Sequence, residues 1–140
     1  MDEAGSGAAA AFVTTHLGET YDVLAPDRCE IRLLVDTTRR SLAHGTLLPG
    51  RVSLAIAHRT VEEVWYVTAG RGQVWRKQDG HELVVAVAPG TALTIPRGAH
   101  FQFRATGSEP LCFVMWTMPP WPGEQEAVRV PDHWPVLETD

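Results

Sequence analysis

Turn-forming residues recur at short, nearly even intervals along this chain, and that spacing is the feature that most constrains its fold. From residue 30 onward, short runs of alternating or β-branched residues are separated by turns that contain glycine or proline, such as Leu48-Pro49-Gly50 and Ala88-Pro89-Gly90. The runs predict strands over 30–36, 41–48, 52–58, 62–68, 73–78, 82–87, 91–95, 100–105 and 111–117. Short strands with a turn signal roughly every 8–12 residues predict an all-β sandwich or barrel.

Size and charge narrow the class of protein further. The chain has 140 residues, which suffices for one domain with a single sizeable core. Its net charge of −5 leaves no basic surplus for nucleic-acid binding. No apolar run approaches the roughly 20 residues needed to cross a bilayer, and no basic residue precedes the run Ala8–Phe12, unlike in a secretory signal. We therefore expect a cytoplasmic protein that binds neither nucleic acid nor membrane.

The composition divides the chain into three parts. Residues 1–15 are small and polar, and we expect a flexible N-terminal arm there. Residues 16–118 contain the strand pattern and are expected to form the barrel. Residues 119–140 are rich in proline and tryptophan; because proline lacks a backbone donor, this tail cannot form a regular central strand. We expect it to wrap the outside of the barrel, with Trp121 and Trp134 as anchors.

Two glycine-bounded blocks contain the residues that can do chemistry. The first block runs from Gly50 to Gly70 and contains Ile56, His58 and Glu63. Five residues separate Gly50 from position 56, and one residue separates position 56 from His58. Four residues then precede Glu63, and six more precede Gly70.

The second block begins at Gly90 and contains Pro96, Gly98, Phe101 and Ala105, with intervals of five, one, two and three residues. Together, the two blocks resemble the paired motifs of the cupin superfamily. The resemblance implies a cupin double-stranded β-helix, a jelly-roll barrel, over roughly residues 30–118.

The resemblance also implies a position for a divalent metal, held in cupins by two histidines and a glutamate of the first motif and a histidine of the second. Ile56 and Phe101 occupy two of these four positions here, so only His58 and Glu63 remain. A site with two protein ligands would bind metal weakly.

Two other histidines offer a way to complete such a site. His44 reaches the same cavity if Leu42, His44 and Thr46 face inward. His100 is expected to face outward, unless a bulge beside Gly98 turns it inward. In either case the candidate metal ligands would be His58 and Glu63 with His44 or His100, for iron, manganese, zinc or nickel. This alternative predicts a metal-dependent dioxygenase or isomerase.

The period-two alternation of strands predicts which residues line the barrel. The expected inward-facing pocket residues are Leu54, Ile56, Trp65, Val67, Phe101 and Phe103. They surround His58 and Glu63, so the sequence predicts an apolar cavity with one imidazole and one carboxylate, as is common in small-molecule sites. Burial and pairing would act in opposite directions on the pKa of each group.

We interpret His58 and Glu63 as a catalytic acid–base pair acting on a hydrophobic metabolite, in a reaction of the isomerase, cyclase, dehydratase or lyase type. The same sequence also fits a non-catalytic barrel that binds a small ligand, in which the pair forms only a structural hydrogen bond. Fold alone does not choose between these functions.

The outer face of the strand over 62–68 carries Val64 and Tyr66, and nearby strands add Trp75 and Trp116. Aromatic residues exposed on a sheet commonly form an interface. We therefore expect a homodimer.

Overall fold

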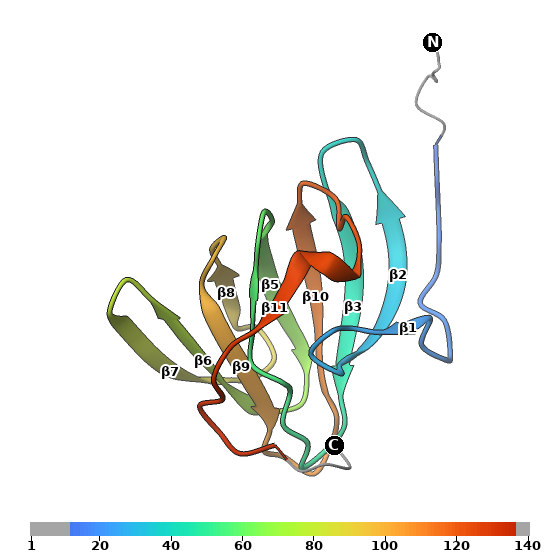
Figure 1. The fold of residues 1–140 in the computed structure, drawn as a ribbon. Coiled ribbons are helices and arrows are strands. Elements are labelled where there is room, and N and C mark those ends of the chain that lie inside the picture. The colour runs from blue at the N-terminus through green and yellow to red at the C-terminus, as the bar shows by residue number, and fades with distance from the viewer. Residues whose placement is uncertain (1–11, 137–140) are drawn as a thin grey trace.

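A computed structural model of the chain describes residues 12–136 (Figure 1). Within these residues the elements are β1 (Val23–Leu24), β2 (Glu30–Asp36), β3 (Ser41–Leu47), β4 (Ile56–His58), β5 (Glu62–Ala69), β6 (Gly72–Gln78), β7 (His81–Val87), β8 (Ala92–Ile95), β9 (His100–Ala105), β10 (Leu111–Met118), the short 3-10 helix η1 (Glu124–Glu126) and β11 (Ala127–Arg129). The arm expected over 1–15 falls mainly on residues 1–11, outside this range. No helix in the described part is long and apolar enough to cross a membrane.

The strands form two antiparallel sheets that face each other (Figure 1). One sheet has the order β1-β2-β3-β10-β5-β8, and the other has the order β11-β4-β9-β6-β7. Strands that neighbour each other in space are often distant in sequence, as β10 pairs with both β3 and β5. This arrangement confirms the prediction of an all-β double-stranded helix.

Alternation along the strands builds the core between the sheets. On β5, Trp65 and Val67 are buried while Val64 and Tyr66 are exposed. Trp65 stacks on Phe113 of β10 with ring centroids 4.1 Å apart, and it meets the edge of Phe103 at 5.1 Å. Because each ring is almost fully buried, this aromatic cluster contributes a large share of the buried apolar surface that stabilises the barrel.

The turn between β5 and β6 requires glycine at position 70. Gly70 adopts φ +79°, and a Cβ there would clash with the Pro110 carbonyl oxygen. Any side chain would therefore combine backbone strain with a clash between the β5–β6 turn and the start of β10. This explains why the first block ends on a glycine.

The strand expected over 52–58 is wrong in its first half. Only β4 (Ile56–His58) is regular, and Val52 makes an isolated bridge to Arg104. The Ser53 hydroxyl accepts a hydrogen bond from the Phe103 N–H at 3.0 Å, so a side chain replaces part of the strand ladder here. The alternation predicted for this segment therefore does not extend back to Leu54.

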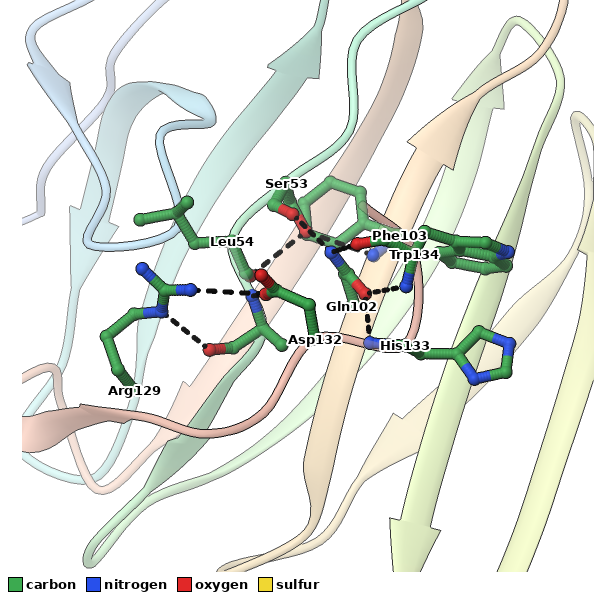
Figure 2. Close-up of polar contacts among 9 residues, drawn as sticks. Ser53, Leu54, Gln102, Phe103, Arg129, Asp132, His133 and Trp134 are labelled. Atoms are coloured by element: carbon green, nitrogen blue, oxygen red, sulfur yellow. Dashed lines mark hydrogen bonds and ion pairs between the residues drawn. The ribbon is translucent and has the colours of Figure 1, made fainter. Parts of the chain in front are cut away.

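The C-terminal tail contacts the outer face of β9 through Gln102 (Figure 2). This side chain has no exposed surface. Its Nε2 donates to the carbonyl oxygens of Ser53 and Trp134 at 2.9 and 3.0 Å. Its Oε1 accepts the backbone N–H groups of His133 and Trp134 at 2.9 and 2.8 Å. All the hydrogen-bonding capacity of the amide is used, and it fixes the tail to the barrel.

Two aromatic contacts add to this attachment. The Arg104 guanidinium lies 4.4 Å from the ring centroid of Trp134, and His133 stacks on Trp75 at 5.1 Å. Upstream of these residues, β11 pairs with β4 as an edge strand. The tail is therefore held at two places, both C-terminal to the segment that reaches the cavity described next.

Candidate functional site

A cavity of about 370 Å³ opens between the two sheets, lined by β1 to β5, β9, β10, the loop before β2 and the start of the tail. Its apolar wall includes Ile56, Trp65, Phe101, Phe113, Met115 and Trp121. Its polar groups include Asp27, His58, Glu63 and Thr117, all of which are buried. The volume and the mostly apolar lining are those of a site for a small organic molecule.

Glu63 lies on the inner face of β5 and is 5% exposed. Its Oε1 accepts the indole N–H of Trp65 at 2.9 Å, and its Oε2 accepts the hydroxyl of Thr117 at 2.8 Å. Burial raises the pKa of Glu63, and the two hydrogen bonds oppose this rise only in part. The carboxyl group is thus held in one orientation while its affinity for a proton is increased.

His58 ends β4 and is 3% exposed. Its ring meets Phe101 and Trp121 edge-on, with centroids 5.2 and 5.4 Å apart. Burial lowers the pKa of His58 to about 4, although the Glu126 carboxylate acts in the opposite direction. The imidazole is therefore neutral at neutral pH, and its buried Nδ1 has no hydrogen-bond partner among the described residues.

His58 and Glu63 line the same cavity but do not form a hydrogen bond or an ion pair with each other in the described structure. Glu63 is instead bonded to Trp65 and Thr117. The sequence places the two residues near each other across a tight turn, but the side chain of Thr117, from a distant strand, could not be assigned to the site by spacing alone.

Asp27 is a site residue that the sequence did not indicate. It lies in the loop between β1 and β2, is 6% exposed and lines the cavity. Its Oδ1 accepts the Cys29 N–H at 3.0 Å. Burial raises the pKa of Asp27 to about 7, and the nearby Glu63 carboxyl adds to the rise. The only signal available in the sequence is a Pro-Asp turn before a strand, which normally lies at the surface.

The tail contributes a third buried carboxylate, Glu126. It accepts hydrogen bonds from the Thr60 N–H, the Thr60 hydroxyl at 2.6 Å and the Val61 N–H at 2.8 Å. Burial raises the pKa of Glu126, but these donors outweigh that effect and the net pKa is lowered. Glu126 therefore fastens the tail to the turn between β4 and β5, which carries His58 and Glu63 at its two ends.

The residues at the four cupin ligand positions supply few atoms that could bind a metal. Ile56 and Phe101 are 2% and 1% exposed and place hydrocarbon where two ligands would stand. His44 does not face inward, because its neighbours Ala43 and Gly45 occupy the inner face of β3. Among residues 12–136, no three His, Cys, Asp or Glu side chains are grouped so as to hold a metal. The donor set does not fit a resident divalent metal.

His100 begins β9 and is half-buried, and it does not line the cavity. Of the six apolar residues expected in the pocket, Ile56, Trp65 and Phe101 line it. Val67 and Phe103 are buried in the core beyond it. Leu54 is half-buried outside the lining, because the segment before β4 is irregular.

Two facing antiparallel sheets that enclose a small-molecule cavity define a single-chain jelly-roll barrel. Comparison with known families identifies it further, because the cupin domain profile matches residues 43–117. The chain belongs to the cupin domain family. No curated protein sequence matches it significantly.

Solved structures give the same fold at low sequence identity. The Staphylococcus aureus capsular polysaccharide assembling protein CapF superposes with a TM-score of 0.65 and 18% identity, over 74% of this chain and 32% of CapF. A Klebsiella pneumoniae conserved protein with a double-stranded β-helix domain gives 0.62 and 16%, over 74% and 85% of the two chains. Bacillus subtilis oxalate decarboxylase, which has Mn(II) centres, gives 0.63 and 18%, over 73% and 28%. This chain therefore spans about a third or less of CapF and of oxalate decarboxylase, and the likeness concerns the fold alone.

Proposed function

We propose that this protein is a small-molecule enzyme that moves protons on a ligand held in the cavity. The observation that carries the proposal is the presence of two buried carboxyl groups, Asp27 and Glu63, and a neutral imidazole, His58, around one apolar space. Groups whose environments shift their pKa values toward neutrality are the ones suited to acid–base catalysis.

The three groups have complementary roles in this proposal. Asp27, with a pKa raised to about 7, is present in both protonation states at neutral pH and can give or accept a proton. Glu63 is the second carboxyl group, oriented by Trp65 and Thr117. His58 is a neutral imidazole that can hydrogen-bond a polar atom of the ligand.

The reaction class follows from these roles. One carboxylate accepts a proton from the ligand while the other carboxyl group delivers one elsewhere on it, so the number of protons on the enzyme is unchanged. Isomerisation, cyclisation and dehydration all consist of such paired transfers. The apolar wall favours a hydrophobic metabolite.

The alternative function is a metal-dependent reaction in the same cavity; Bacillus subtilis oxalate decarboxylase, which has this fold, has Mn(II) centres. Hydrocarbon at positions 56 and 101 and the outward direction of His44 argue against it for this chain. The proton transfers proposed for the cavity need no metal.

The proposal is tested by proton exchange in D₂O. The protein is incubated with a panel of small ketones, enones and aromatic metabolites, and deuterium incorporation and product formation are followed by NMR and mass spectrometry. We expect exchange or conversion of at least one compound by the wild type and its loss in Glu63→Gln, with Glu109→Gln, an exposed carboxylate on the β9–β10 turn, as the matched control. Compounds that bind saturably but are never exchanged would instead identify a non-catalytic binding barrel.

A further inference from the structure

The charged groups around the cavity all carry the same sign. Asp27 and Glu63 are buried in its wall, and Asp36 and Glu124 are exposed residues of its lining. No lysine or arginine lines the cavity within residues 12–136. Residues 1–11 and 137–140 contain neither amino acid. The cavity therefore offers carboxyl groups to a ligand with no basic side chain to balance them.

Aromatic rings make up much of the remaining wall. Trp65, Phe101, Phe113 and Trp121 all line the cavity. The faces of such rings carry partial negative charge, so they attract ammonium and guanidinium groups and repel anions. The attraction is stronger where water is excluded, as it is around these mostly buried rings. The aromatic wall and the carboxyl groups thus favour the same kind of ligand.

His58 supplies an observation independent of the acidic cluster. It lines the cavity, is 3% exposed and has a buried Nδ1 with no hydrogen-bond partner among the described residues. A buried polar atom without a partner is costly, so such an atom beside a cavity indicates a missing ligand group. A neutral imidazole has one donor and one acceptor nitrogen, and in the tautomer that leaves Nδ1 as the acceptor the N–H of an amine would satisfy it.

Other ligand charges fit this environment less well. An anion would add a negative charge beside two buried carboxyl groups, with no lysine or arginine in the described lining to offset it. A neutral hydrocarbon would do nothing to stabilise the ionised form of Asp27 or Glu63. A cation would stabilise both ionised forms in surroundings where charge interactions are strong.

We propose that the cavity accepts a small organic cation, an amine or ammonium group attached to an apolar body. The carboxyl groups of Asp27 and Glu63 hold the charged nitrogen, and Trp65, Phe101 and Trp121 enclose the rest. The inference rests on the proposed function, since it names the substrate class of the same cavity, and it sets this site apart from one built for an anionic substrate.

The test uses three probes of nearly equal size that differ in charge at pH 7.5: benzylamine (cation), benzyl alcohol (neutral) and benzoate (anion). Binding to the full-length wild type is measured by isothermal titration calorimetry and by the fluorescence of the cavity tryptophans. We expect benzylamine to bind at least about tenfold more tightly than the other two, a difference of about 1.4 kcal/mol. Asp27→Asn and Glu63→Gln should each weaken benzylamine binding about tenfold and change benzyl alcohol binding less than about twofold, while Glu109→Gln should change neither.

The outcomes separate this inference from the proposed function. Equal binding of the three probes, preference for benzyl alcohol or benzoate, or binding of none of them would overturn the cationic ligand. Deuterium exchange on a neutral metabolite, lost in Glu63→Gln, would at the same time leave the proton-transfer function standing. If benzylamine binds selectively but no compound is ever exchanged, the cationic ligand stands and the catalytic proposal fails.

Discussion

Replacing Asp27 by asparagine should make the protein more stable at high pH, and by an amount that the structure allows to be worked out. Burial raises the pKa of Asp27 from 3.8 to about 7 in the folded protein. The folded protein therefore keeps a proton on Asp27 that the unfolded chain releases between these two pH values. As pH rises through this window, the wild type loses stability, and the loss is complete above about pH 7.

The size of the loss follows from the shift. A shift of about three pKa units, at about 1.4 kcal/mol per unit, corresponds to about 4 kcal/mol of unfolding free energy. Asparagine carries no charge at any pH, and its amide oxygen can still accept the Cys29 N–H. The variant should thus match the wild type near pH 4 and exceed its stability by up to about 4 kcal/mol near pH 8.

His58 contributes in the opposite direction and must be considered in the same experiment. Its pKa falls from 6.5 to about 4 on folding, so its contribution to stability is lost as pH falls from 6.5 toward 4. The contribution of His58 to stability is present in both the wild type and Asp27→Asn. The difference between Asp27→Asn and the wild type therefore removes the His58 contribution and reports Asp27 together with its coupling to Glu63, whereas the pH profile of either protein alone does not.

The assay is urea denaturation of both proteins at half-unit steps from pH 4 to pH 8, followed by tryptophan fluorescence. The expected difference in unfolding free energy is close to zero at pH 4 and grows in favour of Asp27→Asn as the pH increases. A difference that is flat across the range would refute the argument, since it would mean that Asp27 titrates alike in the folded and unfolded chains. Glu109→Gln, which removes an exposed carboxylate outside the cavity, is measured alongside as the control.

Further predictions follow from other contacts. Thr117→Val removes the hydroxyl that donates to Glu63 at 2.8 Å, so the pKa of Glu63 should rise further. Carboxyl 13C NMR measures this pKa, and an unchanged or lower value would contradict the prediction. Gln102→Ala leaves buried backbone groups of the tail unpaired and should destabilise the fold by about 2–3 kcal/mol in urea denaturation, whereas a change below about 0.5 kcal/mol would show that the tail is not held there. Added Mn²⁺ should raise the melting temperature by less than about 1 °C, because the donor set does not fit it; a saturable increase would restore the metal-dependent alternative. We also propose a homodimer through the exposed face of β5, so that changing both Val64 and Tyr66 to aspartate should lower the mass measured by light scattering, and an unchanged dimer would place the interface elsewhere.

The fold could be predicted because it depends on repeated local signals. Turn residues and period-two alternation located most strands within one residue, and the inner faces of β5 and β9 were assigned correctly, with Trp65 and Phe101 inside. The inward–outward alternation of side chains fails where a side chain replaces a backbone group in the hydrogen bonds between strands. The Ser53 hydroxyl accepts the Phe103 N–H of β9, and Leu54 does not take the inward-facing position that alternation predicts for it.

The site could be predicted only in part, because most of the cavity lining comes from segments without a motif. His58 and Glu63 sit in a fixed spacing and both line the cavity. Asp27 and Trp121 reach it from a loop and from the tail, and their positions depend on long-range packing that no local pattern encodes. Alternation alone allows His44 to face either inward or outward on β3. The packing of Gly45 against Phe113 places Gly45 on the inner face, so His44 faces outward.

At neutral pH the cavity holds carboxyl groups with raised proton affinity beside a neutral imidazole. The most direct measurement is an NMR titration of the side-chain carboxyl carbons of Asp27 and Glu63 and of the ring nitrogens of His58, from pH 3 to pH 9. We expect Asp27 to titrate near 7, Glu63 to titrate above its ordinary value, and His58 to stay neutral down to about pH 4. Ordinary values for Asp27 and Glu63 would contradict this expectation, because both carboxyl groups would then be ionised at neutral pH and neither could deliver the proton that the proposed paired transfer requires.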